Sequence, residues 1–251
     1  MSTEVNELVN CSNPAPRATR DIDLLGQLDN DPELLAEVFR EVCLVSSFPD
    51  GLEFDAGTLL HEPIAHGAGH PGSRFKVLAR LDRAEVNLQI DVGFGNTVSP
   101  EPLEFEYPVL LDMPAPRLKG YQMETLIAEK LDAFIRRGEA SSRIKDFYDI
   151  WYLSTNFSFD GSILLNSVKS TLSRRDTDVP DDLNSLLEAY SSDPARQAQW
   201  SAFIRSRVLF EAPEDFVMVV EAVHVFVSPV LLAVSSGTEF DRNWDPSAGW
   251  R

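Results

Sequence analysis

The sequence predicts an α+β fold, in which a small mixed-sheet core is followed by an α-helical bundle. Before about Asp112, segments alternate apolar and polar side chains with the period of a β-strand; after it, apolar positions recur every three or four residues, as in helices. The 251 residues are 43% hydrophobic, which suffices for a buried core. We therefore expect an α/β core over residues 1–112, a helical domain over 113–234 and a polar tail over 235–251.

The first third of the chain carries the sheet signals. After an irregular start over residues 1–16, a strand is expected at about 18–25. A helix should follow, because Asp31 precedes Pro32 and an apolar face. The alternating segments 75–81 and 85–94 are separated by three residues, which predicts an antiparallel hairpin. The Gly- and Pro-rich segment 61–73 predicts a surface loop.

The remainder of the chain carries helix signals. The first helix of this part should end at Gly138, a common helix stop, and the second should begin at Ser141 or Ser142. Further helices are expected at about 162–174, 181–190, 194–208 and 213–233. The last of these overlaps the long uncharged segment between Glu221 and Glu239, which we interpret as a buried helix.

Composition excludes several classes of protein. Forty acidic and 22 basic residues give a net charge of −18, which argues against a protein that coats DNA or anionic membranes. The two cysteines, Cys11 and Cys43, have neither C-x-x-C nor zinc spacing. The N-terminus shows no basic region followed by an apolar one, so we expect a cytoplasmic protein with no membrane partner.

Three acidic residues in predicted strands suggest a metal site. Asp21 and Asp23 lie two positions apart, so in a strand both side chains point to one face. Asp91 lies inside an apolar strand, where an ionised carboxylate needs a cation or hydrogen-bond donors. If these strands are neighbours, the three carboxylates could bind the divalent metals of a phosphoryl or nucleotidyl transferase. The alternatives are an exposed strand pair or helix cap for Asp21 and Asp23, and a salt bridge to Arg80 or Arg83 for Asp91.

A basic island lies within this acidic chain. Residues 113–145 contain seven Lys or Arg and four Asp or Glu, a local net charge of +3. Lys130 lies on one predicted helix, and Asp146 and Asp149 lie on the next. Such an island could bind a triphosphate or an RNA backbone. The alternative is that these cations pair with neighbouring acids or lie exposed to solvent on the helix surfaces.

Two further patterns are set aside as sites. Residues 67–72 fit G-x-G-x-x-G, but they do not link a strand to a helix, so no dinucleotide site is expected. The segment H-E-P-I-A-H differs from the zinc motif H-E-x-x-H, and Pro63 breaks the helical register that the motif requires. His61, Glu62, His66 and His70 are therefore assigned to a surface loop.

Taken together, several segments resemble the AbiEii/AbiGii-type toxin nucleotidyltransferases, a branch of the DNA polymerase β-like superfamily. The matching segments are R-A-T-R-D-I-D-L-L, Q-I-D-V-G-F-G, Y-P-V-L-L-D-M-P-A-P-R-L-K-G-Y, E-T-L-I-A-E-K-L-D-A-F-I and S-R-I-K-D-F-Y-D-I-W. Their order and spacing carry the resemblance, which runs from about Arg17 to about Val234. It implies a nucleotidyltransferase core that moves a nucleotide from an NTP to an acceptor such as tRNA, with Mg²⁺ or Mn²⁺ as cofactor. It also implies a toxin or phage-defence role opposed by a cognate antitoxin.

The resemblance assigns roles to individual residues. Asp21 and Asp23 match the metal-binding D-x-D, and Asp91 matches the third, catalytic carboxylate. Lys130 matches the lysine that contacts nucleotide phosphates, and Asp146 would orient it or act as a base. Thr19 and Arg20 are expected to contact the nucleotide. The possible RNA or phosphate contacts are Arg17, Arg136, Arg137, Arg143 and Lys145.

One element of the family pattern is absent from this sequence. A Gly-Gly-Ser/Thr turn that binds triphosphate normally precedes the D-x-D, whereas residues 1–16 contain no glycine. Either the chain starts late, or it is a truncated and inactive binding module with this fold, or the phosphates are bound otherwise. A further alternative is an antibiotic-modifying nucleotidyltransferase, which acts on small molecules and would use the same carboxylates.

Overall fold

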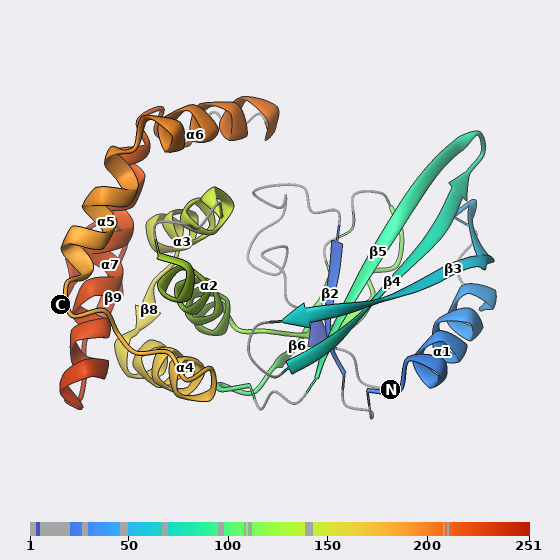
Figure 1. Ribbon diagram of the computed structural model, residues 1–251, viewed down its shortest axis with the longest axis horizontal. Coiled ribbons are helices and arrows are strands. Elements are labelled where there is room, and N and C mark those ends of the chain that lie inside the picture. The colour runs from blue at the N-terminus through green and yellow to red at the C-terminus, as the bar shows by residue number, and fades with distance from the viewer. Residues whose placement is uncertain are drawn as a thin grey trace. The chain divides into compact units, whose positions relative to one another are not determined.

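The computed structural model describes residues 4–5, 21–26, 30–45, 50–66, 70–94, 98–107, 109, 112–138, 143–207, 209 and 211–251. These residues form two compact units. The sheet unit contains the described residues up to Phe94 together with 103–121, and the helical unit contains 98–102 and 122–251. Figure 1 shows the strands of the first unit in blue to green and the helices of the second in green to red. The predicted order of a mixed sheet followed by helices is confirmed.

The sheet unit is built on a seven-stranded mixed sheet in the order β3-β4-β5-β2-β1-β7-β6. Its strands are β1 (Glu4–Val5), β2 (Asp21–Gly26), β3 (Leu52–His66), β4 (His70–Leu81), β5 (Ala84–Phe94), β6 (Leu103–Glu106) and β7 (Arg117–Gly120). Strand β2 runs parallel to β5 and antiparallel to β1, while β3, β4 and β5 are joined by antiparallel pairing. The predicted hairpin is therefore confirmed as β4 and β5.

Helix α1 (Pro32–Leu44) covers one face of this sheet (Figure 1). The carboxylate of Asp31 caps it, accepting hydrogen bonds from the amides of Glu33 at 3.0 Å and Leu34 at 3.3 Å. The core beneath the helix consists of Leu35, Ala36, Phe39, Phe75 and Val92. Because side chains alternate along a strand, this packing leaves the neighbours of Phe75 and Val92 on the opposite face of the sheet.

Three expectations for this region need correction. Residues 61–66 and 70–73 belong to strands β3 and β4 rather than to a surface loop. Strand β3 is at the edge of the sheet, where a proline such as Pro63 is tolerated because only one side of the strand pairs. Strands β6 and β7 were not expected, and because β7 ends at Gly120 the sheet unit extends beyond the predicted boundary at residue 112.

The helical unit contains the predicted helices. They are α2 (Met123–Arg137), α3 (Ile144–Asn156), α4 (Gly161–Arg174), α5 (Leu183–Ser192), α6 (Pro194–Arg207) and α7 (Phe216–Ser236). Helix α2 ends at Gly138, whose φ of 53° is in the range that glycine tolerates best, as predicted. Helix α3 begins after Arg143, and the predicted caps Ser141 and Ser142 lie outside the described residues.

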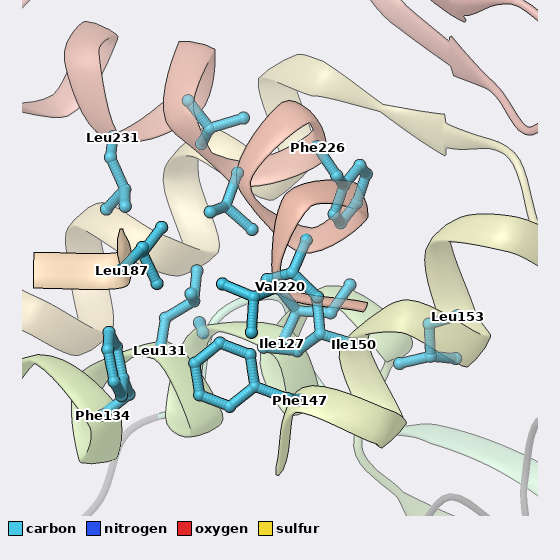
Figure 2. Packing of buried hydrophobic residues seen from close by; sticks show 14 of the residues in the cluster. Ile127, Leu131, Phe134, Phe147, Ile150, Leu153, Leu187, Val220, Phe226 and Leu231 are labelled. Atoms are coloured by element: carbon cyan, nitrogen blue, oxygen red, sulfur yellow. The ribbon is translucent and has the colours of Figure 1, made fainter. Parts of the chain in front are cut away.

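The core of the helical unit brings together side chains from all six of these helices. Figure 2 shows Ile127, Leu131 and Phe134 of α2 beside Phe147 and Ile150 of α3. Leu187 of α5 and the α7 residues Val220, Phe226 and Leu231 complete the group. By length and composition α7 could cross a membrane, a criterion that the core helix of a soluble protein also meets. The burial of one side of α7 in this core confirms the expectation of a buried helix.

The C-terminal segment is not the separate polar tail that composition suggested. Strands β9 (Asn243–Asp245) and β10 (Gly249–Trp250) pair with β8 (Phe159–Asp160) in a three-stranded sheet. Trp244 is buried, and its Nε1 donates a hydrogen bond to the carbonyl of Ser154 at 2.6 Å. Trp250 stacks on Phe226 with 5.6 Å between ring centroids. Two tryptophans thus anchor a segment that is otherwise polar, because each buries a large apolar surface.

Candidate functional site

A row of charged residues crosses four strands of the sheet unit. Glu62 on β3, Arg74 on β4, Asp91 on β5 and Asp23 on β2 are successive register partners. Register partners present their side chains on the same face of a sheet. This face lies opposite the one that α1 covers, because Phe75 and Val92, the sequence neighbours of Arg74 and Asp91, pack under the helix.

The parallel pairing of β2 with β5 brings the predicted metal-binding acids together at the backbone level. Asp23 is the register partner of Asp91, and Asp21 is the partner of Gln89. Asp21 and Asp23 are exposed, and Asp91 is partly buried. Paired strands lie about 4.8 Å apart, so the Asp23 and Asp91 carboxylates repel each other unless a cation intervenes. In kind and register, these oxygen donors fit a divalent metal ion.

The side chain of Asp91 already has a cationic partner. Arg74 Nε donates to Asp91 Oδ1 at 2.7 Å, and Arg74 Nη2 donates to Oδ2 at 2.6 Å. The expected alternative partner Arg80 pairs instead with Asp55 at 2.9 Å and Glu85 at 3.2 Å. Arg74 was not expected, because the predicted three-residue link would place Phe75 opposite Asp91. The structure pairs Leu81 with Ala84, and this register places Arg74 there instead.

The Arg74–Asp91 ion pair bears on whether the acids of β2 and β5 can bind a metal ion. Across the described part of the chain, no three His, Cys, Asp or Glu side chains are arranged to hold a metal ion. At this face, both oxygens of Asp91 accept hydrogen bonds from Arg74. The acids on β2 and β5 therefore fit a metal by donor chemistry and by register, and a metal bound by all three carboxylates would have to compete with Arg74 for Asp91.

The second group of predicted residues lies in the helical unit. Lys130 Nζ of α2 donates to Asp149 Oδ2 of α3 at 2.6 Å and lies 3.5 Å from Asp146 Oδ1. Arg143 Nε lies 2.5 Å from Asp146 Oδ2. The Asp149 side chain is fully buried and that of Asp146 is 3% exposed, whereas Lys130 keeps 16% of its surface exposed. Two buried acids are thus balanced by two cations, and both cations reach the surface.

Asp149 is therefore the nearest partner of Lys130, a role that the sequence reasoning assigned to Asp146. The signal was available, because residues three apart on a helix share a face and both acids lie in K-D-F-Y-D. A cavity of about 10 Å³ beside Lys130 and Asp146 is otherwise lined by apolar side chains. It has room for at most a single water molecule, so it is not a nucleotide pocket.

The residues of the basic island divide into two kinds. Arg136 pairs with Asp132 at 2.7 Å, and Arg143 pairs with Asp146, so both neutralise acids of their own helices. Arg137 and Lys145 are exposed. The other predicted nucleotide or RNA contacts, Arg17, Thr19 and Arg20, lie outside the described residues.

The two patterns that were set aside carry no site among the described side chains. His61 Nε2 lies 3.2 Å from Ser73 Oγ, and Glu62 accepts from Lys76 Nζ at 2.9 Å. His66 and His70 lie on strands, and residues 67–69 of the glycine motif lie outside the described part of the chain.

Comparisons with known proteins agree with this organisation. The family model described as "Nucleotidyl transferase AbiEii toxin, Type IV TA system" matches residues 8–222. A crystal structure from H. pylori whose description proposes a nucleotidyltransferase has a TM-score of 0.52 at 13% identity, covering 96% of this chain and 91% of its own. JHP933 from Helicobacter pylori has a TM-score of 0.52 at 12% identity, covering 94% and 87%. No curated protein matches this chain. With its family match spanning the acidic strands and the Lys130 helix pair, the chain belongs to the AbiEii nucleotidyl transferase toxin family.

Proposed function

We propose that this protein moves a nucleotide from an NTP to an acceptor such as tRNA, as the toxin of a toxin–antitoxin system. The observation that carries the proposal is the register of Asp23 with Asp91, which aligns the D-x-D with a third carboxylate in a chain of this family. The proposed cofactor is Mg²⁺ or Mn²⁺ at Asp21, Asp23 and Asp91. The family description also supports a cognate antitoxin as partner, and we include phage defence in the proposal.

The proposed reaction is a displacement at the α-phosphorus of the NTP. An acceptor hydroxyl oxygen forms the new bond to phosphorus, the bond to the β-phosphate oxygen breaks, and pyrophosphate leaves. A bound divalent metal supplies neutralisation of the charge that develops on the phosphates. Asp21, Asp23 and Asp91 would hold the metal, and Asp91 would also accept the proton of the attacking hydroxyl.

The helical unit contributes cations to the proposed function. The Lys130 side chain is 16% exposed, and Asp149 orients its ammonium through a 2.6 Å hydrogen bond, which suits a residue that neutralises phosphate. Asp146, between Lys130 and Arg143, acts as a positioning residue. Arg137 and Lys145 are proposed as contacts to an RNA backbone, because both are exposed.

The test is transfer of label from α-labelled NTPs to a tRNA pool by the purified full chain with Mg²⁺. We expect transfer by the parent and a loss of at least about a hundredfold in Asp21→Asn and Asp23→Asn, because each removes a metal ligand. Glu85→Gln is the matched control, since it removes an acid from β5 that pairs with Arg80 away from Asp91. The proposal fails if the parent transfers no label, or if the two aspartate variants transfer as well as Glu85→Gln.

The Arg74–Asp91 ion pair favours a second candidate, a non-catalytic binding module with this fold. In such a protein Arg74 would permanently neutralise Asp91, and the fold would serve association with the antitoxin or another protein. This candidate predicts no transfer to any acceptor and an undiminished affinity for the antitoxin in Asp21→Asn.

A further inference from the structure

Arg74 lies at the centre of the charged face of the sheet unit. Its guanidinium meets Asp91 at 2.7 and 2.6 Å. With the Gln89 amide turned so that its oxygen accepts, the same guanidinium donates to it twice at 3.2 Å. Glu62 is the register partner of Arg74 on β3, and Asp21 faces it from β2, two strands away. Arg74 therefore contacts two residues of β5, Gln89 and Asp91, which are the register partners of Asp21 and Asp23 on β2.

The contact uses the groups that a metal ion would use. A guanidinium fork engages both oxygens of a carboxylate in one plane, so Arg74 occupies both Asp91 oxygens. A divalent cation bound by Asp23 and Asp91 needs at least one of them. The two cations carry charge of the same sign and bind the same carboxylate, so each weakens the binding of the other.

The exposures of the partners favour withdrawal of the arginine. The Arg74 side chain is 32% exposed and that of Asp91 is 12% exposed, so the guanidinium has a path to solvent whereas the carboxylate is more constrained. Glu62, the register partner of Arg74 on β3, is already paired with Lys76 at 2.9 Å, so a displaced Arg74 moves to solvent. A partly exposed ion pair of this kind is weak enough to be displaced by a bound divalent ion.

We propose that Arg74 is the internal counter-ion of the metal site: it holds Asp91 until a divalent cation displaces it, and so sets the metal affinity. The inference rests on the proposed function, because it takes Asp21, Asp23 and Asp91 as the metal ligands. It assigns Arg74 a role in tuning the site, in addition to stabilising the sheet. The consequence is that removing Arg74 tightens metal binding, whereas loss of an ordinary structural contact would weaken it.

The face offers a matched control for long-range electrostatics. Lys76 lies two residues further along β4, so it shares the face of Arg74, and it pairs with Glu62 at 2.9 Å. Lys76→Gln removes the same unit of charge from the same strand without touching Asp91. A difference between Arg74→Gln and Lys76→Gln therefore reports the direct contact with Asp91.

The experiment measures binding of Mn²⁺ alone to the full chain, from the electron paramagnetic resonance signal of the free ion. We expect Arg74→Gln to bind about tenfold more tightly than the parent, a change equivalent to about 1.4 kcal/mol. Arg74→Lys, which keeps the charge and loses the fork, should fall between the two, and Lys76→Gln should change affinity by less than about twofold. In an Asp91→Asn background, Arg74→Gln should have no effect, because the competition is for that carboxylate.

The outcomes separate this inference from the proposed function. If the parent binds Mn²⁺ and Asp21→Asn does not, the metal site stands. An Arg74→Gln variant that is folded by circular dichroism and binds equally or more weakly then overturns the counter-ion role alone. Equal tightening by Lys76→Gln would also overturn it, since bulk charge would explain the effect. If neither the parent nor Arg74→Gln binds Mn²⁺, the metal part of the proposed function fails and the inference fails with it.

Discussion

Asp23 on β2 and Asp91 on β5 are register partners in a parallel strand pair, so two carboxylates lie side by side on the face opposite α1. Parallel register partners 68 residues apart in the sequence become neighbours only when β2 inserts between β5 and β1. The predictions below test this face and the buried contacts of the helical unit.

Asp23→Asn should abolish stabilisation of the protein by Mg²⁺. A metal that binds only the folded protein raises its Tm, and this increase depends on the ligands that hold it. We expect the parent to gain several degrees in excess Mg²⁺ and Asp23→Asn to gain none, measured by differential scanning calorimetry. Glu85→Gln should gain as much as the parent, and an equal gain in Asp23→Asn would contradict the assignment.

Asp149→Ala should strongly destabilise the helical unit. It would leave Lys130 without its 2.6 Å partner in a nearly buried position, and breaking a buried ion pair in this way costs about 3–5 kcal/mol. The measurement is the urea midpoint followed by helical circular dichroism. Lys145→Gln, on the exposed side of the same helix, serves as control and should leave the midpoint unchanged. Similar midpoints for the two variants would show that the contact is weak.

Two carboxylates of the helical unit should give pH dependences of opposite sign. Burial, with a smaller contribution from the charge of Asp160, raises the pKa of Glu124, so the folded state binds this proton more tightly than the unfolded state. Its contribution to stability is present below the ordinary glutamate pKa and is lost as the pH rises through the raised value. Glu124→Gln should therefore raise Tm at pH 7 and have little effect near pH 4.

Asp160 provides the opposite case. The hydroxyl of Ser162, and then the amides of Ile163 and Ser162, lower the pKa of its carboxyl at the start of α4. The stabilisation is present above the ordinary aspartate pKa and is lost as the pH falls through the lowered value. Asp160→Ala should cost about 1 kcal/mol at pH 7, as loss of an N-cap does, and less in acid. Calorimetric scans of Glu124→Gln and Asp160→Ala from pH 3 to 7 measure both effects. A change of Tm with pH of the opposite sign in either variant would contradict its prediction.

Gly161→Ala should loosen the C-terminal sheet. An added Cβ would lie 2.5 Å from the carbonyl oxygen of Arg242 and 2.7 Å from the Phe240 ring, closer than real contacts allow. We expect a loss of about 1–3 kcal/mol, measured from chemical unfolding, with a red shift of tryptophan fluorescence as Trp244 becomes exposed. Gly93→Ala is the control, because nothing lies within 4 Å of its added Cβ. Equal stability of the two variants would contradict the close approach.

Arg137→Gln combined with Lys145→Gln should weaken binding of tRNA and reduce its salt dependence. If both side chains contact phosphates, the slope of log affinity against log salt should fall by about 1.4–1.8, measured by fluorescence anisotropy. Lys169→Gln, an exposed lysine on α4, should leave the slope unchanged. An unchanged slope in the double variant would exclude Arg137 and Lys145 from the RNA contact.

The elements with the strongest local patterns were predictable. Helices α2 to α7 follow from apolar residues at helical spacing, and Gly138 marks the end of α2 because glycine tolerates a positive φ. Strand β3 was not predictable in the same way, because His, Gly and Pro residues hide its period. The polar composition of the C-terminal segment likewise hid the burial of Trp244, which depends on contacts with distant residues.

By itself, the sequence determined that Asp21 and Asp23 share a face and that Lys130 and two aspartates lie on consecutive helices, because these facts depend only on local periodicity. It also carried the resemblance that the family match confirmed. The tertiary structure decided which residues pair with these side chains. Asp91 lies beside Asp23, Arg74 binds Asp91, and Asp149 binds Lys130. These pairings depend on strand order, register and helix packing, which arise from contacts between segments far apart in the chain.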